Sequence, residues 1–171
     1  MPRLNYIVPP PIDAVDQGVA DLCWLAATTV LYSWRDARRW TMSEAAKQLG
    51  VEFVAHHAAG SALAYAELAL WRSRGSFGME YQQCIAGDGW NTLLRSHGPL
   101  ITLIDGTGSG SIDHAVVVYG IEGDGGSKNT FLSVANGQGG TLQKFSLHDF
   151  VTIFEVGPGS NQLFSVMYCK R

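Results

Sequence analysis

The chain has 171 residues, of which 46% are hydrophobic and 16% charged, with a net charge of −3. This composition is typical of a globular domain with a sizeable apolar core, and the length favours a single domain over residues 1–171. The acidic balance and the absence of long Lys or Arg runs argue against nucleic acid as a partner, and no stretch approaches the roughly 18 uncharged apolar residues of a membrane span.

The first half of the chain carries mostly helical patterns. Residues 1–20 are rich in proline, with Pro9-Pro10-Pro11 at the centre, and we expect an irregular, extended segment there. The stretch over about 22–34 is apolar on nearly all faces, which predicts a helix buried on most sides. Capping residues and glycine stops predict further helices over 42–49, 61–74 and 88–96.

The second half of the chain is dominated by short β-prone runs between Gly, Asp and Ser clusters. A helical turn is predicted near 146–149, and the Gly- and Ser-rich loop over 106–111 is expected to form a flexible rim. Helices followed by strands indicate an α+β fold. The predicted strands are 100–104, 115–121, 131–135 and 164–169.

Cys23 opens the apolar helical run, and Gln17 precedes it by six residues. A thiol at a helix N-terminus lies close to unpaired backbone N–H groups and to the positive end of the helix dipole, so we expect a thiolate near neutral pH. The Gln17 amide, brought back beside the sulfur, is expected to donate a hydrogen bond to the oxyanion that forms when the sulfur attacks a carbonyl. Such a nucleophile needs a base, and the base needs an orienting group.

Candidates for these two roles lie in the strand-rich half. His114 begins one apolar β-branched run, and Asn136 ends another. We assign His114 as the general base for Cys23 and Asn136 as the residue that orients the imidazole. Asp124 and Asn129 are rivals for the orienting role, although both are expected at a hairpin tip that points away from His114.

Four residues, in this order along the chain, resemble the catalytic residues of papain-like cysteine proteases: Gln17, Cys23, His114 and Asn136. The interval of six between the first two, the tryptophan at position 24 and the Asp-His-Ala-Val run at 113–116 are similar to that family as well. The resemblance implies an N-terminal helical half with a buried nucleophile helix and a C-terminal antiparallel β half, with the cleft between them. It also implies a peptidase that uses no metal or other cofactor.

The chain departs from the usual family pattern in three places. Ala20 stands where the first cysteine of a Cys-Gly-Ser-Cys-Trp motif would lie, so the usual disulfide cannot form there. Asn136 is followed by Gly-Gln-Gly-Gly in place of the Ser-Trp-Gly that normally shields the Asn–His hydrogen bond. The interval from Cys23 to His114 is shorter than the roughly 130–150 residues of cathepsin-like enzymes. The resemblance is therefore to a compact bacterial branch, in which secreted effectors and toxin domains are frequent.

Other conspicuous residues are expected to be structural. The pair His56-His57 has no further ligand at metal-binding spacing, so we expect it in a surface loop and predict no metal site. Asp113 is either a charge that tunes the pH response of His114 or an exposed side chain. Packing roles are expected for Trp71, Trp90, Cys84 and Cys169.

These features predict a cysteine peptidase that acts on protein or peptide substrates. The same residues also suit a deamidase or transglutaminase, because an acyl-thioester accepts either water or an amine, and a non-catalytic binding module is a third hypothesis. Since the N-terminus lacks the apolar core of a cleavable signal peptide, we expect synthesis in a bacterial cytoplasm and, for action on another cell, delivery by a specialised secretion system. An immunity or inhibitor protein would then protect the producer.

Overall fold

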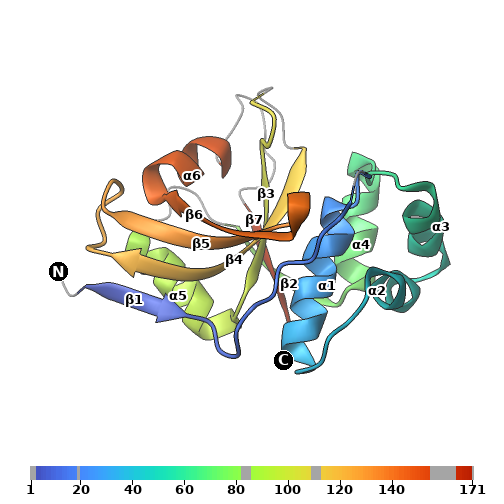
Figure 1. Ribbon diagram of the computed structural model, residues 1–171, viewed down its shortest axis with the longest axis horizontal. Coiled ribbons are helices and arrows are strands. Elements are labelled where there is room, and N and C mark those ends of the chain that lie inside the picture. Colours follow the sequence, from blue (N-terminus) through green and yellow to red (C-terminus); the bar gives the residue numbers. More distant parts are fainter. Residues whose placement is uncertain (1–2, 19, 82–85, 109–112, 155–164, 171) are drawn as a thin grey trace.

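The computed structural model describes residues 3–18, 20–81, 86–108, 113–154 and 165–170 (Figure 1). Within these residues the chain forms six α-helices and one antiparallel sheet of seven strands. Figure 1 shows the helices within residues 23–74 gathered beside the sheet, while those over 87–97 and 147–154 lie over it. The α+β class expected from the sequence is therefore confirmed.

The helical half is built around α1, whose apolar residues are buried on nearly every side, as the sequence pattern predicts. The other helices of this half lie beside it. The elements of the helical half are α1 (Cys23–Arg35), α2 (Met42–Leu49), α3 (Val51–Ala59), the 3-10 turn η1 (Tyr65–Glu67) and α4 (Leu68–Arg74).

Two predictions about this half are wrong. Gly50 was expected only to stop a helix, but with a φ of 130° it joins α2 directly to α3, so His56 and His57 lie on a helix and not in a surface loop. The helix predicted over 61–74 begins later, because Ala64 is extended and its N–H is capped by the Glu67 carboxylate at 2.6 Å.

The sheet has the strand order β2-β7-β3-β4-β5-β6, and β1 pairs with the far part of β4. All neighbouring strands are antiparallel. The strands are β1 (Leu4–Ile7), β2 (Phe77–Tyr81), β3 (Leu100–Ile104), β4 (His114–Gly123), β5 (Thr130–Asn136), β6 (Thr141–Ser146) and β7 (Ser165–Cys169).

Three of these strands were not expected from the sequence: β1, β2 and β6. Residues 4–7 belong to a segment predicted to be irregular, yet they add a strand to the sheet because β4 continues past the end of β3 and leaves an edge to be paired. The simple order of helices first and strands later is therefore incomplete, since β1 and β2 come from the first half of the chain.

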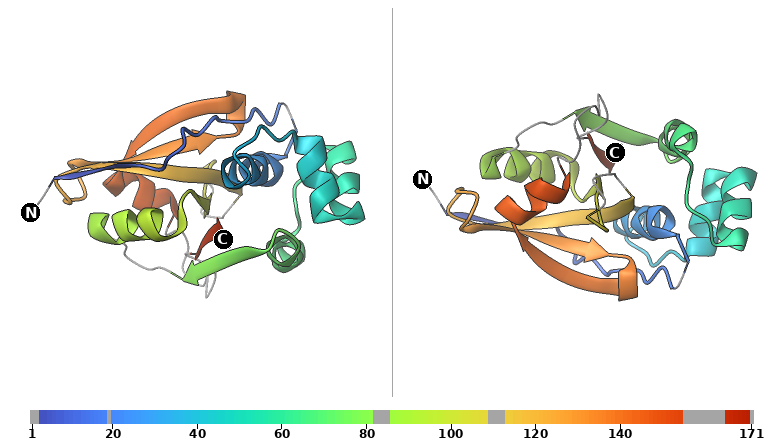
Figure 2. Two further views of the ribbon diagram at one scale, coloured as in Figure 1. Left: turned by 90° about the horizontal axis from the view of Figure 1, so that it is seen from below. Right: turned by 90° about the horizontal axis from the view of Figure 1, so that it is seen from above.

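Helices α5 (Gly87–His97) and α6 (Leu147–Phe154) lie against one face of the sheet (Figure 2). Trp90 of α5 packs against Phe150 and Phe154 of α6, with ring centroids 5.5 and 5.6 Å apart. Trp90 and Trp71 are fully buried, as their expected packing roles require. Cys169 is buried in β7, and this burial raises its pKa to about 12; Cys84 lies outside the described residues.

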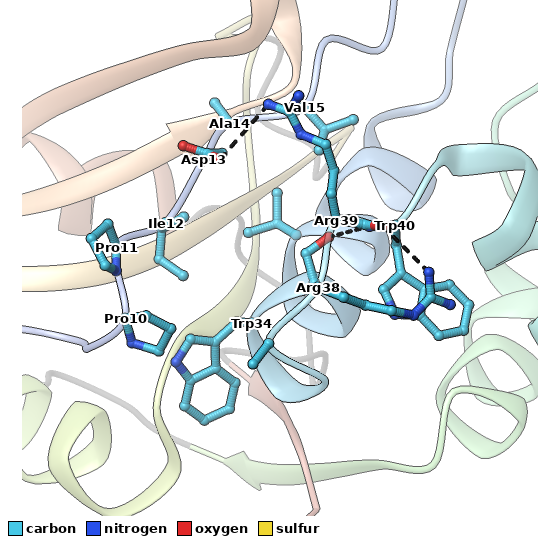
Figure 3. Close-up of a pocket in the computed structure, with 13 residues that line it drawn as sticks. Pro10, Pro11, Ile12, Asp13, Ala14, Val15, Trp34, Arg38, Arg39 and Trp40 are labelled. Carbon is cyan, nitrogen blue, oxygen red and sulfur yellow. Dashed lines mark hydrogen bonds and ion pairs between the residues drawn. The ribbon is translucent and has the colours of Figure 1, made fainter.

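Residues 8–15 cross from the sheet to the C-terminal end of α1 (Figure 3). The Val8 N–H donates to the Tyr119 carbonyl at 2.9 Å, and the Trp34 indole N–H donates to the Pro9 carbonyl at 2.9 Å. The segment thus connects β4 to α1 and leads the chain towards Gln17.

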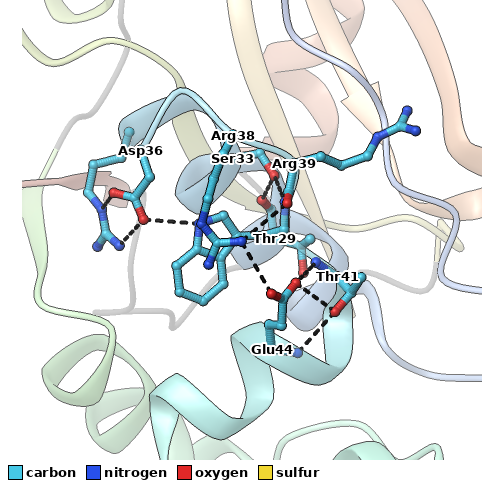
Figure 4. Close-up of polar contacts among 9 residues, drawn as sticks. Thr29, Ser33, Asp36, Arg38, Arg39, Thr41 and Glu44 are labelled. Atoms are coloured by element: carbon cyan, nitrogen blue, oxygen red, sulfur yellow. Dashed lines mark hydrogen bonds and ion pairs between the residues drawn. The ribbon is translucent and has the colours of Figure 1, made fainter.

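The turn after α1 is held by a polar network (Figure 4). Asp36 accepts hydrogen bonds from Arg35 and from the Trp40 indole. Thr41 and Glu44 form the capping box that the sequence predicts at the start of α2.

Among the helices of the described ranges, none has the length and apolar character needed to cross a membrane.

Candidate active site

The candidate catalytic residues meet where the N-terminus of α1 packs against one end of the sheet. Cys23 is the first residue of α1, and His114 is the first residue of β4. In the sheet, His114 pairs with Ile104 at the end of β3, and Asn136 ends β5 opposite Val116. Antiparallel pairing therefore places His114 and Asn136 at the same end of two neighbouring strands.

The His114 ring is oriented by Asn136. His114 Nε2 lies 2.8 Å from Asn136 Oδ1, which also accepts a hydrogen bond from the Gln138 N–H at 3.0 Å. Because the Gln138 N–H can only donate, it identifies the Asn136 atom as oxygen, and His114 Nε2 must then carry a proton. In the neutral ring, Nδ1 is left as the basic nitrogen.

The two rivals for the orienting role lie elsewhere. Asp124 and Asn129 belong to the turn between β4 and β5, at the opposite end of the ten-residue strand β4 from His114. There the Asn129 amide donates to the Asp124 carboxylate at 2.9 Å. Both side chains stabilise this turn.

The surroundings of the Cys23 sulfur favour the neutral thiol. Burial is the largest effect and raises the pKa of Cys23, and the negative charge of Asp21 acts in the same direction. Backbone hydrogen bonds from Ala115 and Trp24 lower this pKa without reversing the shift. The helix terminus does not by itself favour the thiolate here, because desolvation outweighs the backbone N–H groups. Ionisation of this thiol needs a base.

Gln17 is 9% exposed and is held in one orientation. Its Nε2 donates to the Ala20 carbonyl at 2.9 Å, and its backbone N–H donates to the Gly137 carbonyl at 2.8 Å. An amide nitrogen carries two protons, so the second N–H can serve a ligand in the cavity that Gln17 lines. The side-chain oxygen is packed towards Gly137, where an added Cβ would lie 2.7 Å from it.

The structure brings all four predicted residues to one cavity of about 560 Å³: Gln17, Cys23, His114 and Asn136. A smaller side pocket of about 150 Å³ opens beside Cys23 and His114. Its other walls are mainly apolar and include Leu63, Leu68, Trp71 and Leu103. The sequence did not predict that these residues share a pocket, because they come from three separate parts of the chain, and it indicated only a packing role for Trp71.

Asp113 is exposed and anchors the rim of the cavity. Its carboxylate accepts hydrogen bonds from the Gly106 N–H at 2.7 Å and from the Thr107 hydroxyl. Asp105 accepts from the Gly108 N–H at 2.7 Å. These bonds fix the rim over 105–108, while 109–111, also predicted to be flexible, lie outside the described residues.

Among the residues that the structure describes, no three His, Cys, Asp or Glu side chains form a group suited to a metal ion.

Comparison with known families decides the class of this site. A family model described as papain-like cysteine protease AvrRpt2 matches residues 8–154. The chain belongs to this family. The papain-like resemblance seen in the sequence is thereby confirmed, and the protein is a papain-like cysteine peptidase.

A solved structure supports the fold of this papain-like peptidase. It is the crystal structure of a double-glycine-motif protease from an AMS/PCAT transporter, in complex with the leader peptide. The match has a TM-score of 0.52, covers 98% of this chain and 97% of that chain, and has 13% sequence identity. Comparison with curated proteins gave no match.

The contact between Gly137 and Gln17 yields a first prediction. Gly137→Ala should push the Gln17 amide out of place, because the new Cβ would lie 2.7 Å from its oxygen, while the φ of −67° at this position suits alanine. We expect turnover of a peptide substrate to fall at least about 10-fold, since removal of one oxyanion donor costs about 100–1000-fold.

The matched control is Gly126→Ala in the distant turn between β4 and β5, where the nearest atom is a carboxylate oxygen of the exposed Asp124 side chain at 3.1 Å. It should keep full turnover. Full turnover in Gly137→Ala, with an unchanged thermal unfolding midpoint, would remove Gln17 from the site.

Proposed function

We propose that the protein hydrolyses peptide bonds in protein or peptide substrates, with Cys23 as nucleophile, His114 as general base and acid, Asn136 as the orienting residue and Gln17 in the oxyanion hole. The observation that carries the proposal is that these four residues line a single cavity. Within it, the contact of Asn136 with His114 Nε2 leaves Nδ1 as the nitrogen that can accept the thiol proton. The complex of the structurally similar protease with its leader peptide supports a peptide substrate.

The reaction follows from these positions. His114 Nδ1 takes the proton of Cys23, and the thiolate attacks the peptide carbonyl. The oxyanion accepts hydrogen bonds from the Gln17 amide and the backbone N–H of Cys23. Protonated His114 then gives its proton to the departing amine, and the acyl group remains on the sulfur as a thioester. A water molecule, deprotonated by His114, attacks this thioester and restores the thiol.

The side pocket supports a preference for an apolar substrate residue near the scissile bond. Leu63, Leu68 and Leu103 line it beside Cys23 and His114, and its volume of about 150 Å³ suits one aliphatic side chain. Burial of a Leu-sized side chain contributes about 1.5–3 kcal/mol to the free energy of substrate binding, which is enough for a clear preference for peptides that carry such a residue. Delivery to another cell and an immunity or inhibitor partner stay predictions of the sequence.

Replacement of the nucleophile tests the proposal. Cys23→Ala should abolish peptide cleavage and leave the fold intact, because alanine is a good helix former at the first position of α1. Cleavage is measured by intact mass of a protein substrate, and folding by circular dichroism. Loss of folding together with activity would make Cys23 a core residue. A wild-type product that differs only by conversion of an amide to an acid, with the chain uncut, would identify a deamidase.

The role of Asn136 is tested by two substitutions with different hydrogen-bonding capacity. Asn136→Ala should lower kcat by about 10–100-fold, the scale for loss of an orienting partner. Asn136→Asp should retain much of the activity, because a carboxylate also accepts hydrogen bonds from His114 Nε2 and the Gln138 N–H.

Asp124→Ala provides the control, since this turn side chain lies at the far end of β4. We expect its kcat to stay near the wild-type value. A silent Asn136→Ala together with an inactive Asp124→Ala would assign the orienting role to Asp124.

A further inference from the structure

His56 is held at both ring nitrogens, outside the catalytic residues. From α3, its Nδ1 lies 2.8 Å from the Ser61 hydroxyl and its Nε2 lies 2.8 Å from the Glu67 carboxylate. The His56 side chain is 23% exposed. A ring bonded on two sides in a partly buried place holds together the segments that supply its partners.

These bonds persist whether or not His56 is protonated. In the neutral ring, Nε2–H donates to Glu67 and the Ser61 hydroxyl donates to Nδ1. In the charged ring both nitrogens donate, and the Ser61 hydroxyl can turn to the His56 carbonyl, 3.5 Å away. The Ala64 backbone N–H and His56 both lower the pKa of Glu67, so its carboxylate stays an acceptor at neutral pH.

The same segment is tied to the residue that follows the nucleophile. The Trp24 indole N–H donates to the Ser61 carbonyl at 3.2 Å, and the Trp24 ring meets His56 edge-on at 6.3 Å. The Asp21 N–H donates to the Gly60 carbonyl at 3.1 Å. Residues 60–67 are thus fixed against both α3 and the start of α1.

This segment forms one wall of the side pocket. Ala62, Leu63 and Tyr65 line the pocket, and Ala62 also lines the main cavity at Cys23. Residues 61–64 have no regular secondary structure, so no helix or strand ladder fixes their backbone. One backbone bond, from the Ser61 N–H to the His56 carbonyl at 3.1 Å, ties this stretch to α3, and the side-chain bonds of His56, Trp24 and Glu67 hold it further.

We propose that His56, Ser61 and Glu67 form a clamp that positions the segment between Ser61 and Glu67 as one wall of the side pocket and thereby sets affinity for an apolar substrate side chain. The inference rests on the proposed peptidase function. The three residues are positioning residues, because none of them lines the main cavity or the side pocket. Loss of the clamp should therefore raise KM for a substrate that fills the pocket and leave bond cleavage unchanged.

The test uses His56→Phe in the full chain, which keeps a ring against Trp24 but removes both hydrogen bonds. The adjacent His57→Phe is the matched control on the same helix. Two peptides are compared, with Leu or Gly at the position where the wild type prefers an apolar residue. For His56→Phe we expect KM for the Leu peptide to rise about 10-fold, near the low end of discrimination by an apolar pocket. Its kcat, and both constants for the Gly peptide, should stay within about 2-fold of the wild type.

A purely structural role would give a different result. An equal loss for both peptides, or an unchanged KM ratio in folded His56→Phe, would overturn the clamp. Should His56→Phe fail to fold, Ser61→Ala removes one hydroxyl only, and it must change the KM ratio in the same direction.

Covalent probes separate this inference from the proposed function. Chloromethyl ketones on the same Leu and Gly peptides alkylate an active-site thiol without turnover, and iodoacetamide needs no pocket. If iodoacetamide labels Cys23 but neither peptidyl probe does, the peptidase proposal fails, and the clamp with it. If both probes label Cys23 and His56→Phe keeps the wild-type ratio of their rates, the clamp alone is overturned.

Discussion

The site depends on the register of β4 with β3 and β5. That register places His114 opposite the end of β3 and Asn136 opposite Val116, and it directs the Ala115 backbone towards the Cys23 sulfur. Because side chains alternate along a strand, a slip of one residue would turn His114 to the other face. The orienting hydrogen bond and the backbone contact to the thiol would be lost together.

The fold gives the nucleophile two opposed properties. Packing of α1 against the sheet leaves Cys23 half-buried beside the cavity and holds it in place, but the same desolvation raises its pKa. Reactivity then depends on a partner that can accept the proton inside the cleft. In the proposed mechanism His114 is this partner, because Asn136 Oδ1 lies 2.8 Å from its Nε2 and leaves Nδ1 as the basic nitrogen.

The sequence predicted α1, the start of β4, the end of β5 and four of the residues that line the cavity, because the apolar run, the β-branched runs and the spacing of Gln17 from Cys23 are local signals. It missed β1 because its partner, the far part of β4, is more than a hundred residues away. The position of Cys23 at a helix N-terminus indicated a thiolate. The desolvation that raises the pKa of Cys23 arises from packing against the sheet, which the local sequence does not reveal. The partners of His56 are Ser61, just after α3, and Glu67 in η1, and the sequence did not predict α3 as a helix.

The central claim is that His114 takes the proton of Cys23, and the pH dependence of Cys23 alkylation tests it most directly. Rates are measured by mass spectrometry at Cys23 for the wild type, His114→Ala and the control His57→Ala. In His114→Ala the raised pKa should delay alkylation until the pH approaches or exceeds the ordinary thiol value of 9.0, because only the thiolate reacts. The wild type and His57→Ala should react at clearly lower pH than His114→Ala, because protonated His114 would stabilise the Cys23 thiolate as an ion pair. Superimposable profiles for the wild type and His114→Ala would contradict the account.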